Sequence, residues 1–286
     1  MSDSPQPVII RSTGELREAL QSLGASRKHV GLVPTMGCLH EGHLALVREA
    51  RQKADLVVVT LFVNPTQFGP NEDFAQYPRQ EEEDIAHLSR EGVDLVFIPP
   101  VEEMYPRDYS TYLQEEKLSK GLCGVSRPHH FRGVLTVVAK LFLLINPQSA
   151  FFGQKDAQQC AVIRKMVRDL HFPLEVVTVP TVREEDGLAM SSRNRYLSNV
   201  QREDARTISQ SLFEAQKMVR NGVRNTDRVI AEVTHMLTTK RRIRIIYTSI
   251  VHADTLEPMR EIIPGTSLLA LAVWVDEVRL IDNVLL

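Results

Sequence analysis

Residues Val30–His43, "VGLVPTMGCLHEGH", join a short apolar run to a turn and then to the start of a polar, periodic segment. The apolar run predicts a β-strand over Val30–Val33, and the segment from Gly42 onward predicts an amphipathic helix. In open α/β sheets, ligands bind beyond the carboxyl ends of the parallel strands. The stretch therefore predicts an α/β fold with a ligand site at this turn.

Similar strand-and-helix units extend on both sides of this stretch through the first 180 or so residues. Short β-branched runs begin at Val8, His29, Leu56, Asp94, Ser149 and Leu174. Helical patterns cover Ser12–Leu23, Gly42–Ala54, Gln80–Arg90 and Val134–Ile145. The first of these opens with Ser12 and Glu15 at capping-box spacing. Apolar strands separated by helices indicate a parallel sheet covered on both faces, so we predict a Rossmann-like, doubly wound α/β domain.

The pattern changes after about Pro180. A polar loop leads to a long helix near Ser198–Gly222 and a second helix over Asp227–Leu237. Two β-rich stretches follow, Ile243–Leu256 and Ser267–Leu280, and they are most simply interpreted as antiparallel strands. We therefore predict two domains, a larger one over residues 1–182 and a smaller α+β domain over residues 183–286.

Composition limits the classes of function. The 34 Lys and Arg residues and 36 Asp and Glu residues give a net charge of -2, so no global basic field favours nucleic acid. Cys38, Cys123 and Cys160 lie far apart and contain no Cys-x-x-Cys pair, which argues against a disulfide framework and for a reducing cytoplasm. The N-terminus lacks a secretory pattern, and the longest apolar run is far shorter than the roughly 20 residues of a membrane helix.

His40 and His43 lie three residues apart at the expected start of the helix, where free backbone N–H groups favour a phosphate. Gly37 permits a tight turn, and Gly42 leaves room for a ligand to approach the backbone. The run does not match the His-Glu-x-x-His zinc motif, because position 44 is Leu. A structural turn with two surface histidines is the competing interpretation, and only the wider context separates the two.

Four further stretches supply that context. They are "FVNPTQFGPNEDFAQYPR", "LCGVSRPHHFRGVLTVVAKLF", "FFGQKDAQQ" and "DGLAMSSRN". Together with the opening stretch they resemble, in the same order, the motifs of the pantothenate synthetase (pantoate–β-alanine ligase) family. The "HEGH" and "MSSR" runs also resemble motifs of the wider superfamily of HIGH-motif nucleotidylyltransferases and adenylate-forming enzymes.

The resemblance implies an enzyme of the coenzyme A pathway that condenses (R)-pantoate with β-alanine. ATP first adenylates pantoate and releases pyrophosphate, and β-alanine then attacks the pantoyl adenylate to give pantothenate and AMP. The first domain would bind ATP and pantoate, and the second would close over the site. The resemblance also implies Mg²⁺ with ATP, no tightly bound organic cofactor, and a homodimer, to whose interface the apolar run Leu56–Val63 could contribute.

By the same resemblance, His43 is the proton donor, and His40, Lys155 and Arg193 act beside it on the phosphates. Val182 is expected to reach the adenine through its backbone. The implied ATP contacts are Met36, Gly37, Cys38, Leu39, His40, Glu41, Gly42, His43, Gly153, Gln154, Lys155, Asp156, Val182, Met190, Ser191, Ser192 and Arg193. Relatives commonly have Glu at position 154, which weakens any role there that depends on charge.

Gln67 and Gln159 are the implied pantoate contacts, since an amide can both donate to and accept from hydroxyl and carboxylate groups. Asp84 is the candidate metal ligand. The loop "RPHHFRG" departs from the family pattern at His129, to which we assign no role. Arg127 and Arg132 either hold anionic groups or are structural.

Two other functions fit part of the pattern. A nucleotidyltransferase acting on a phosphorylated small molecule would share "HEGH" without needing the two glutamines, and a non-catalytic ATP sensor would not need the full set of charged residues. An NAD-binding protein is disfavoured because no Gly-x-Gly-x-x-Gly follows an expected strand. A tRNA ligase would need a basic surface that this composition lacks.

Overall fold

The computed structural model describes residues 6–70 and 72–286, which form two compact units. The first unit contains the chain up to Glu116 together with Arg127–Gly153 and Val162–Val179. The second contains Lys117–Ser126, Gln154–Ala161 and Pro180–Leu286. Residues 1–5, which include part of the stretch expected to lack a secretory pattern, lie outside the described residues.

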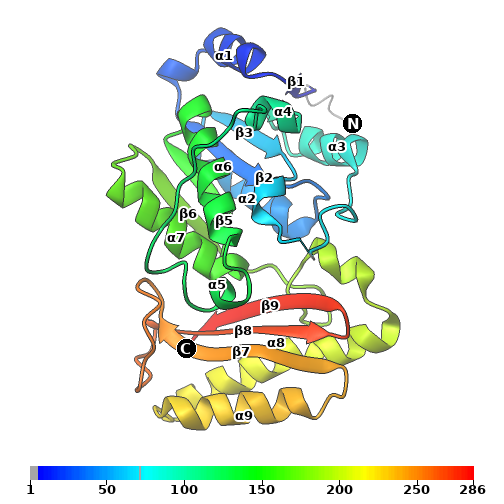
Figure 1. Ribbon diagram of the computed structural model, residues 1–286, viewed down its shortest axis with the longest axis vertical. Helices are drawn as coiled ribbons and strands as arrows, with labels where there is room; N and C mark the ends of the chain where they lie inside the picture. The colour runs from blue at the N-terminus through cyan, green and yellow to red at the C-terminus, as the bar shows by residue number, and fades with distance from the viewer. Residues whose placement is uncertain (1–5, 71) are drawn as a thin grey trace. The chain divides into compact units, whose positions relative to one another are not determined.

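The first unit is built on a six-stranded parallel sheet in the order β1-β4-β3-β2-β5-β6 (Figure 1). Its strands are β1 (Val8–Ile10), β2 (Val30–Thr35), β3 (Leu56–Leu61), β4 (Leu95–Phe97), β5 (Ser149–Gly153) and β6 (Glu175–Val179). All six residues of β3 are buried, as expected for a strand covered on both faces. The predicted doubly wound parallel sheet is confirmed.

Helices cover both faces of this sheet. They are α1 (Thr13–Ser22), α2 (Glu41–Lys53), α3 (Glu81–Arg90), α4 (Val101–Met104), α6 (His130–Ile145) and the C-terminal part of α7 (Ala157–Asp169). Side chains of α2 and α3, among them Val47 and Leu88, pack in one cluster with alternate strand residues such as Val57 and Val59. Helix α6 crosses the opposite face (Figure 1). The capping box predicted at Ser12 and Glu15 is present at the start of α1.

The second unit contains a three-stranded antiparallel sheet in the order β7-β8-β9. Its main elements are β7 (Ile243–His252), β8 (Ser267–Val275), β9 (Val278–Leu285), α8 (Asn199–Arg220) and α9 (Thr226–Thr238). One face packs on α8 and α9, and the other contacts Leu122 and Ala157 from the two short segments Lys117–Ser126 and Gln154–Ala161 of the same unit. Trp274 in β8 pairs across the sheet with Arg244, whose guanidinium lies 6.0 Å from the indole centroid.

Three expectations need correction. The stretch Ser267–Leu280 is a hairpin that turns at Asp276 and continues to Leu285, so the small sheet has three strands instead of two. Helix α6 begins at His130, four residues before the predicted start, because His130, Phe131 and Arg132 already have helical backbone. The run Leu56–Val63 cannot supply an interface through β3, since that strand lies between β4 and β2.

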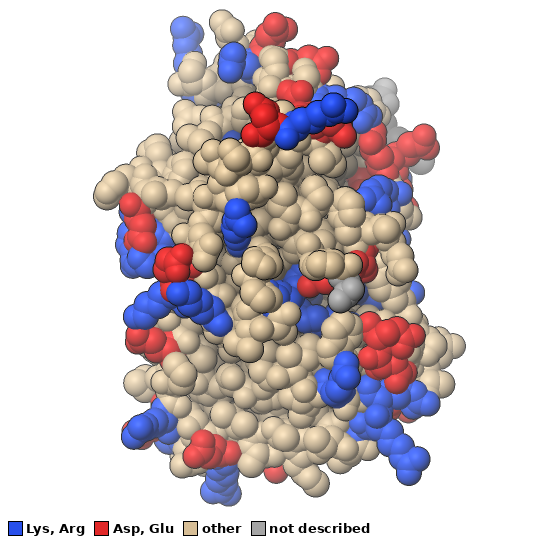
Figure 2. Space-filling model, viewed as in Figure 1, with Lys and Arg blue, Asp and Glu red and all other residues tan. Residues whose placement is uncertain are grey.

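Charged side chains of both signs are intermingled on the face shown in Figure 2, in keeping with the near-zero net charge. The short helices α5 (Cys123–Ser126), η1 (Ala25–Arg27), η2 (Pro65–Gln67), η3 (Gln154–Asp156) and η4 (Ser192–Tyr196) complete the described elements. Within residues 6–70 and 72–286, no helix combines the length and apolarity needed to cross a membrane.

Candidate active site

The sheet of the first unit reverses its winding between β2 and β5. From β2 the chain proceeds to β3 and β4 on one side, whereas β5 pairs on the other side of β2 and is followed by β6. When the connections that follow two neighbouring strands run in opposite directions along the sheet, a crevice forms beyond the carboxyl ends of these strands. Ligands bind there in this class of sheet. The "MGCLHEGH" segment follows β2, and the "QKD" turn, which belongs to the second unit, follows β5 in the chain.

The turn after β2 is held by a buried carboxylate. Gly37 and Cys38 adopt left-handed φ angles of 78° and 51°, which turn the chain sharply before α2. Asp84 of α3 accepts the backbone N–H of Cys38 at 2.8 Å and that of Leu39 at 2.7 Å. A Cβ on Gly37 would lie 3.0 Å from the Asp84 carboxylate, so the close contact also favours glycine.

Asp84 is only 3% exposed, and this burial raises the pKa of its carboxyl, although the two backbone N–H groups favour the ionised form. The carboxylate was predicted from the sequence as a metal ligand. Its observed contacts give it a second role, the positioning of the turn. The metal role stays a prediction.

His40 and His43 lie together at the start of α2. Their rings stack with centroids 4.0 Å apart and planes 28° from parallel. The His40 backbone N–H donates to Nδ1 of His43 at 3.3 Å, so the neutral imidazole of His43 carries its proton on Nε2. His43 thus has the tautomer in which Nε2–H is the donor that a ligand at the helix N-terminus would meet.

Glu41, the first residue of α2, is half exposed and pairs with Arg48 of the same helix, which also binds Glu91. The pairing offsets the negative charge of Glu41. The N-terminal end of α2 therefore keeps the partial positive charge that favours a phosphate.

The pantoate-binding amide predicted at Gln67 lies in η2, directly after β3. Its Nε2 donates to Sδ of Met36 at 2.8 Å, and its Oε1 accepts from Nδ2 of Asn64 at 3.1 Å. The structure therefore brings this candidate pantoate-binding residue into contact with the turn after β2. Asn64 itself is 1% exposed and also contacts Thr66 and the hydroxyl of Tyr105, whose pKa burial raises to about 12.

The "RPHHFRG" motif holds the same segment in place. His130 Nδ1 and the Arg127 guanidinium both contact the Gln67 carbonyl, at 3.0 and 3.3 Å. Gly133 of α6 packs against the backbone of η2 so closely that an added Cβ would lie 2.4 Å from the Thr66 carbonyl oxygen. The motif thus acts on the site through the backbone of Gln67.

The two arginines of this motif, left open between anion binding and structure, have structural contacts. Arg127 forms a bidentate pair with Glu72 at 2.6 and 2.5 Å. Burial opposes ionisation of Glu72, but the Arg127 hydrogen bond and charge hold its pKa below the ordinary value. Arg132 stacks on Tyr112 with its guanidinium carbon 3.9 Å from the ring centroid. His129 is the exposed N-cap residue of α6.

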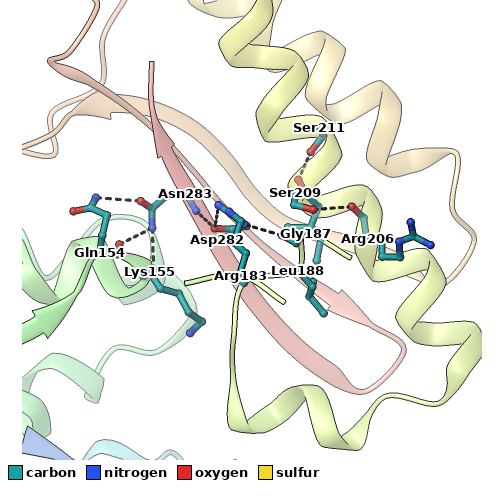
Figure 3. Close-up of polar contacts among 12 residues, drawn as sticks. Gln154, Lys155, Arg183, Gly187, Leu188, Arg206, Ser209, Ser211, Asp282 and Asn283 are labelled. Carbon is teal, nitrogen blue, oxygen red and sulfur yellow. Dashed lines mark hydrogen bonds and ion pairs between the residues drawn. The ribbon is translucent and has the colours of Figure 1, made fainter. Parts of the chain in front are cut away.

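In the second unit, the "QKD" turn forms η3 and is anchored to β9 (Figure 3). Lys155 is half-buried, and its ammonium lies 3.7 Å from the Asp156 carboxylate. Gln159 follows in the first turn of α7 and is half-buried, beside the fully buried Gln158, which binds the backbone of Cys123.

The "DGLAMSSRN" segment begins in the turn of a tight hairpin of the second unit, in which Arg183 pairs with Ala189. Met190 N–H donates to the Val182 carbonyl at 3.0 Å, so adenine recognition by this backbone would use the Val182 N–H or the remaining lone pair. The Ser191 hydroxyl accepts from Arg193 N–H at 3.3 Å and caps η4. Ser192 is buried and Arg193 half-buried. The hairpin is further tied by Arg202, which pairs with Glu184 and Asp186.

Several residues that shape these segments were not singled out from the sequence. They are Asn64, Arg183, Asp282 and Asn283, and each is a polar side chain that binds backbone or another buried group. A usable signal existed only for the last two, because "DN" interrupts the apolar strand "VRLIDNVLL". Buried polar residues of this kind are normally hydrogen-bonded, but sequence does not say to what.

A doubly wound parallel sheet whose switch point carries two stacked imidazoles on a helix N-terminus defines an α/β protein of the nucleotide-binding class. The chain belongs to the pantoate–β-alanine ligase family, whose sequence pattern it matches over residues 8–285.

Individual relatives agree along nearly the full length. The chain is 52% identical to a pantothenate synthetase of Pseudothermotoga lettingae, covering 98% of this chain and 99% of the relative. It is 54% identical to that of Moorella thermoacetica, with 94% and 98% covered. Among solved structures, pantothenate synthetase of Thermus thermophilus superposes with a TM-score of 0.92 at 48% identity, covering 97% of this chain and 98% of that one.

A pantoate–β-alanine ligase from Francisella tularensis, solved as a complex with "Beta-gamma ATP" and β-alanine, superposes with a TM-score of 0.79 at 31% identity. It covers 98% of this chain and 97% of its own. Full-length membership of this family favours the ligase over the two alternatives considered from the sequence.

Proposed function

We propose that this protein catalyses the ATP-dependent condensation of (R)-pantoate with β-alanine, giving pantothenate, AMP and pyrophosphate through a pantoyl-adenylate intermediate. The observation that carries the proposal is the match to the pantoate–β-alanine ligase family over residues 8–285. The stacked histidines support it, because they lie beyond the carboxyl end of β2, the region of such sheets where ligands commonly bind.

The chemistry requires two displacements. A pantoate carboxylate oxygen bonds to the α-phosphorus of ATP while the bond from that phosphorus to the bridging oxygen breaks, and pyrophosphate leaves with the electron pair. The β-alanine amine then bonds to the acyl carbon, the carbon–oxygen bond to AMP breaks, and the amine loses a proton. Adenylation is needed because a free carboxylate is a poor electrophile.

We assign the ATP contacts to the segments predicted from the sequence. In the first unit, Nε2–H of His43 donates to a phosphate oxygen, with His40 beside it and the N–H groups of α2 adding positive potential. In the second unit, the ammonium of Lys155 and the guanidinium of Arg193 offset phosphate charge. Positioned donors of this type are what a loose phosphoryl-like transition state needs.

We assign pantoate recognition to Gln67 and Gln159. The Gln67 amide is oriented by Asn64 and Met36, so its rotamer is already selected before a substrate hydroxyl or carboxylate arrives. Pre-ordering of this kind lowers the entropic cost of binding.

Mg²⁺ would accompany ATP and offset the charge of its phosphates. Among the described residues, no group of three or more His, Cys, Asp or Glu side chains is arranged to hold a metal ion. A magnesium ion that accompanies ATP is typically held mainly by the nucleotide, with one or two carboxylates from the protein. Each oxygen of Asp84 accepts one hydrogen bond and keeps a further lone pair, so this carboxylate remains our candidate.

The test follows oxygen transfer. Protein, ATP and Mg²⁺ are mixed with pantoate labelled with ¹⁸O in its carboxylate, with and without β-alanine. We expect pantoate-dependent pyrophosphate release, and one labelled oxygen in AMP after β-alanine is added. Release of ADP, or unlabelled AMP, would contradict an acyl adenylate.

We also propose a cytoplasmic homodimer. The three cysteines are buried free thiols, which suits a reducing compartment. Sedimentation equilibrium measures the assembly directly, and a mass of one chain across micromolar concentrations would exclude the dimer.

A further inference from the structure

Strand β9 carries two adjacent polar residues in an otherwise apolar run. Asp282 and Asn283 are 2% and 4% exposed. Successive side chains of a strand point to opposite faces, and these two pair across the sheet with Leu271 and Ala270 of β8. Leu271 belongs to the cluster shared with α8 and α9, whereas Ala270 lies on the face that contacts Ala157. The dipeptide therefore reaches both faces of the small sheet.

Asn283 uses both its donors and its acceptor on the "QKD" turn (Figure 3). Its Nδ2 donates to the carbonyl oxygens of Gln154 and Lys155, both at 2.9 Å. Its Oδ1 accepts from Nε2 of Gln154 at 3.2 Å. This contact uses the neutral amide of Gln154 as a hydrogen-bond donor. The backbone from which the Lys155 side chain projects is thereby fixed.

Asp282 acts on the hairpin that precedes Ser191–Arg193. Its carboxylate accepts from both terminal nitrogens of Arg183, at 2.6 and 3.1 Å. Arg183 also donates to the Gly187 carbonyl at 3.1 Å and packs over the ring of Phe213. One strand thus holds two separate segments of the second unit that carry predicted ATP contacts.

We propose that Asn283 is a positioning residue for ATP, which sets the backbone of Gln154 and Lys155 so that the Lys155 ammonium meets the nucleotide phosphates. The proposal rests on the proposed function, since it requires the "QKD" turn to bind ATP. Asn283 does not itself touch the substrate. Loss of its two donors leaves two half-buried carbonyl groups without their partners, and the turn then shifts to recover hydrogen bonds.

The test compares Asn283→Asp with Asn283→Ala. Both remove the two donors, and Asn283→Asp does so without changing size. We expect the KM for ATP to rise about 10-fold or more in each, which corresponds to about one lost hydrogen bond, while the KM for β-alanine changes less than about twofold. Failure of one variant to fold leaves the other to carry this measurement.

A pH profile separates positioning from general loosening of the fold. The carboxyl of Asn283→Asp faces carbonyl oxygens, so it gains a proton readily, and its protonated form donates one hydrogen bond. The activity of Asn283→Asp relative to the unchanged protein should therefore rise as the pH falls from about 8 to about 6. The relative activity of Asn283→Ala should stay flat, because alanine does not titrate.

Leu280→Ala is the matched control, since Leu280 is buried in the same strand and packs in the core of the second unit. It should lower the Tm without raising the KM for ATP. An equal rise in KM for Leu280→Ala, or an unchanged KM for ATP in both Asn283 variants, would overturn the positioning role. If the unchanged protein binds ATP by calorimetry but releases no pyrophosphate, the proposed function fails, while the Asn283 variants still test the proposal through the Kd for ATP. If it binds no ATP, both fail.

Discussion

Two buried aspartates, one in each unit, hold segments that carry predicted ligand contacts. Asp84 binds the N–H groups of Cys38 and Leu39, and Asp282 binds the guanidinium of Arg183. Burial raises the pKa of both carboxyls, because the charged form loses its hydration. Since a paired, ionised carboxylate binds backbone or guanidinium N–H groups more strongly than a neutral group would, each site gains rigidity at a cost in solvation.

The pH dependence of stability tests this cost at Asp84. Its folded pKa lies above its unfolded value, so the folded state binds the proton more tightly. The resulting stabilisation is fully present below the ordinary aspartate pKa of about 4, and it is lost as the pH rises through the folded pKa. The free energy of unfolding of Asp84→Asn and of the unchanged protein can be measured in urea at several pH values. The stability of the variant relative to the unchanged protein should increase as the pH rises. A movement in the opposite direction would mean that the folded pKa is lowered.

His43→Ala tests the proton donor. The residue is half-buried at the start of a helix that buries Leu44, Leu46, Val47 and Ala50, so the variant should fold normally. Pantoate-dependent pyrophosphate release should fall about 100-fold or more, as for removal of one well-placed donor. The control is His129→Ala, an exposed histidine in the "RPHHFRG" loop, which should keep full activity. Equal rates for both variants would remove the assigned role of His43.

At the scale of elements, the contact between α6 and η2 explains why two of the sequence motifs occur together. Gly133 allows the helix to approach the Thr66 carbonyl, and Asn64 Nδ2 donates to the Gly133 carbonyl at 3.1 Å. His130 and Arg127 complete the contact at Gln67. The "NPTQF" and "HHFRG" motifs therefore pack together around Gln67, the candidate pantoate-binding residue.

Gly133→Ala should disrupt this contact between α6 and η2. The substitution gains up to about 1 kcal/mol in helix propensity, but overpacking against backbone 2.4 Å away costs about 1–3 kcal/mol. The overlap is with a carbonyl and not with a flexible side chain, so the cost should dominate. We expect a lower free energy of unfolding in urea and a higher KM for pantoate. Gly14→Ala in α1 is the control, because its Cβ would meet nothing within 4 Å, and it should stabilise the protein without changing the KM.

Local patterns predicted most of these elements from the sequence. Six apolar runs gave the correct strands of the parallel sheet, because strands buried on both faces are continuously hydrophobic. The hairpin of β8 and β9 was missed, since its two-residue turn, Asp276 and Glu277, lacks the glycine or asparagine that usually marks such a turn. The start of α6 was placed late because His130 and Arg132 interrupt the apolar periodicity.

The parts of the candidate site that could be predicted are those whose residues lie within one short sequence motif. Spacing alone placed His40 and His43 on one helix start, and the structure stacks them. The roles of Asp84, Asn64 and Asn283 depend on contacts between residues 45 to 129 positions apart, and no local pattern encodes such pairing. For the same reason, Arg127 and Arg132 could not be distinguished from anion-binding residues until Glu72 and Tyr112 were seen beside them.

At the scale of the whole molecule, the second unit is discontinuous in sequence. Lys117–Ser126 and Gln154–Ala161 belong to it, although most of the chain around them belongs to the first unit. They supply Leu122 and Ala157 to one face of the small sheet, and Cys123 contacts the hydroxyl of Tyr247 at 3.2 Å. A chain passing repeatedly between two units links their folding.

We therefore expect that residues 180–286 expressed alone will not form the native second unit. The face that includes Val251, Leu268 and Ala270 would be exposed, and Asn283 would lose all its partners in η3. The fragment should bind the dye ANS and lack a cooperative thermal transition by circular dichroism. A sharp transition near the Tm of the full protein would show that the segment folds independently.

Trp274 is the only tryptophan of the protein, and it lies in β8 with the guanidinium of Arg244 near its ring. Fluorescence excited selectively in tryptophan therefore comes from the second unit alone. The fluorescence of Trp274 during a titration with nucleotide therefore reports how the small sheet responds to the ligand. During denaturation, the same fluorescence follows the loss of that sheet without any introduced label.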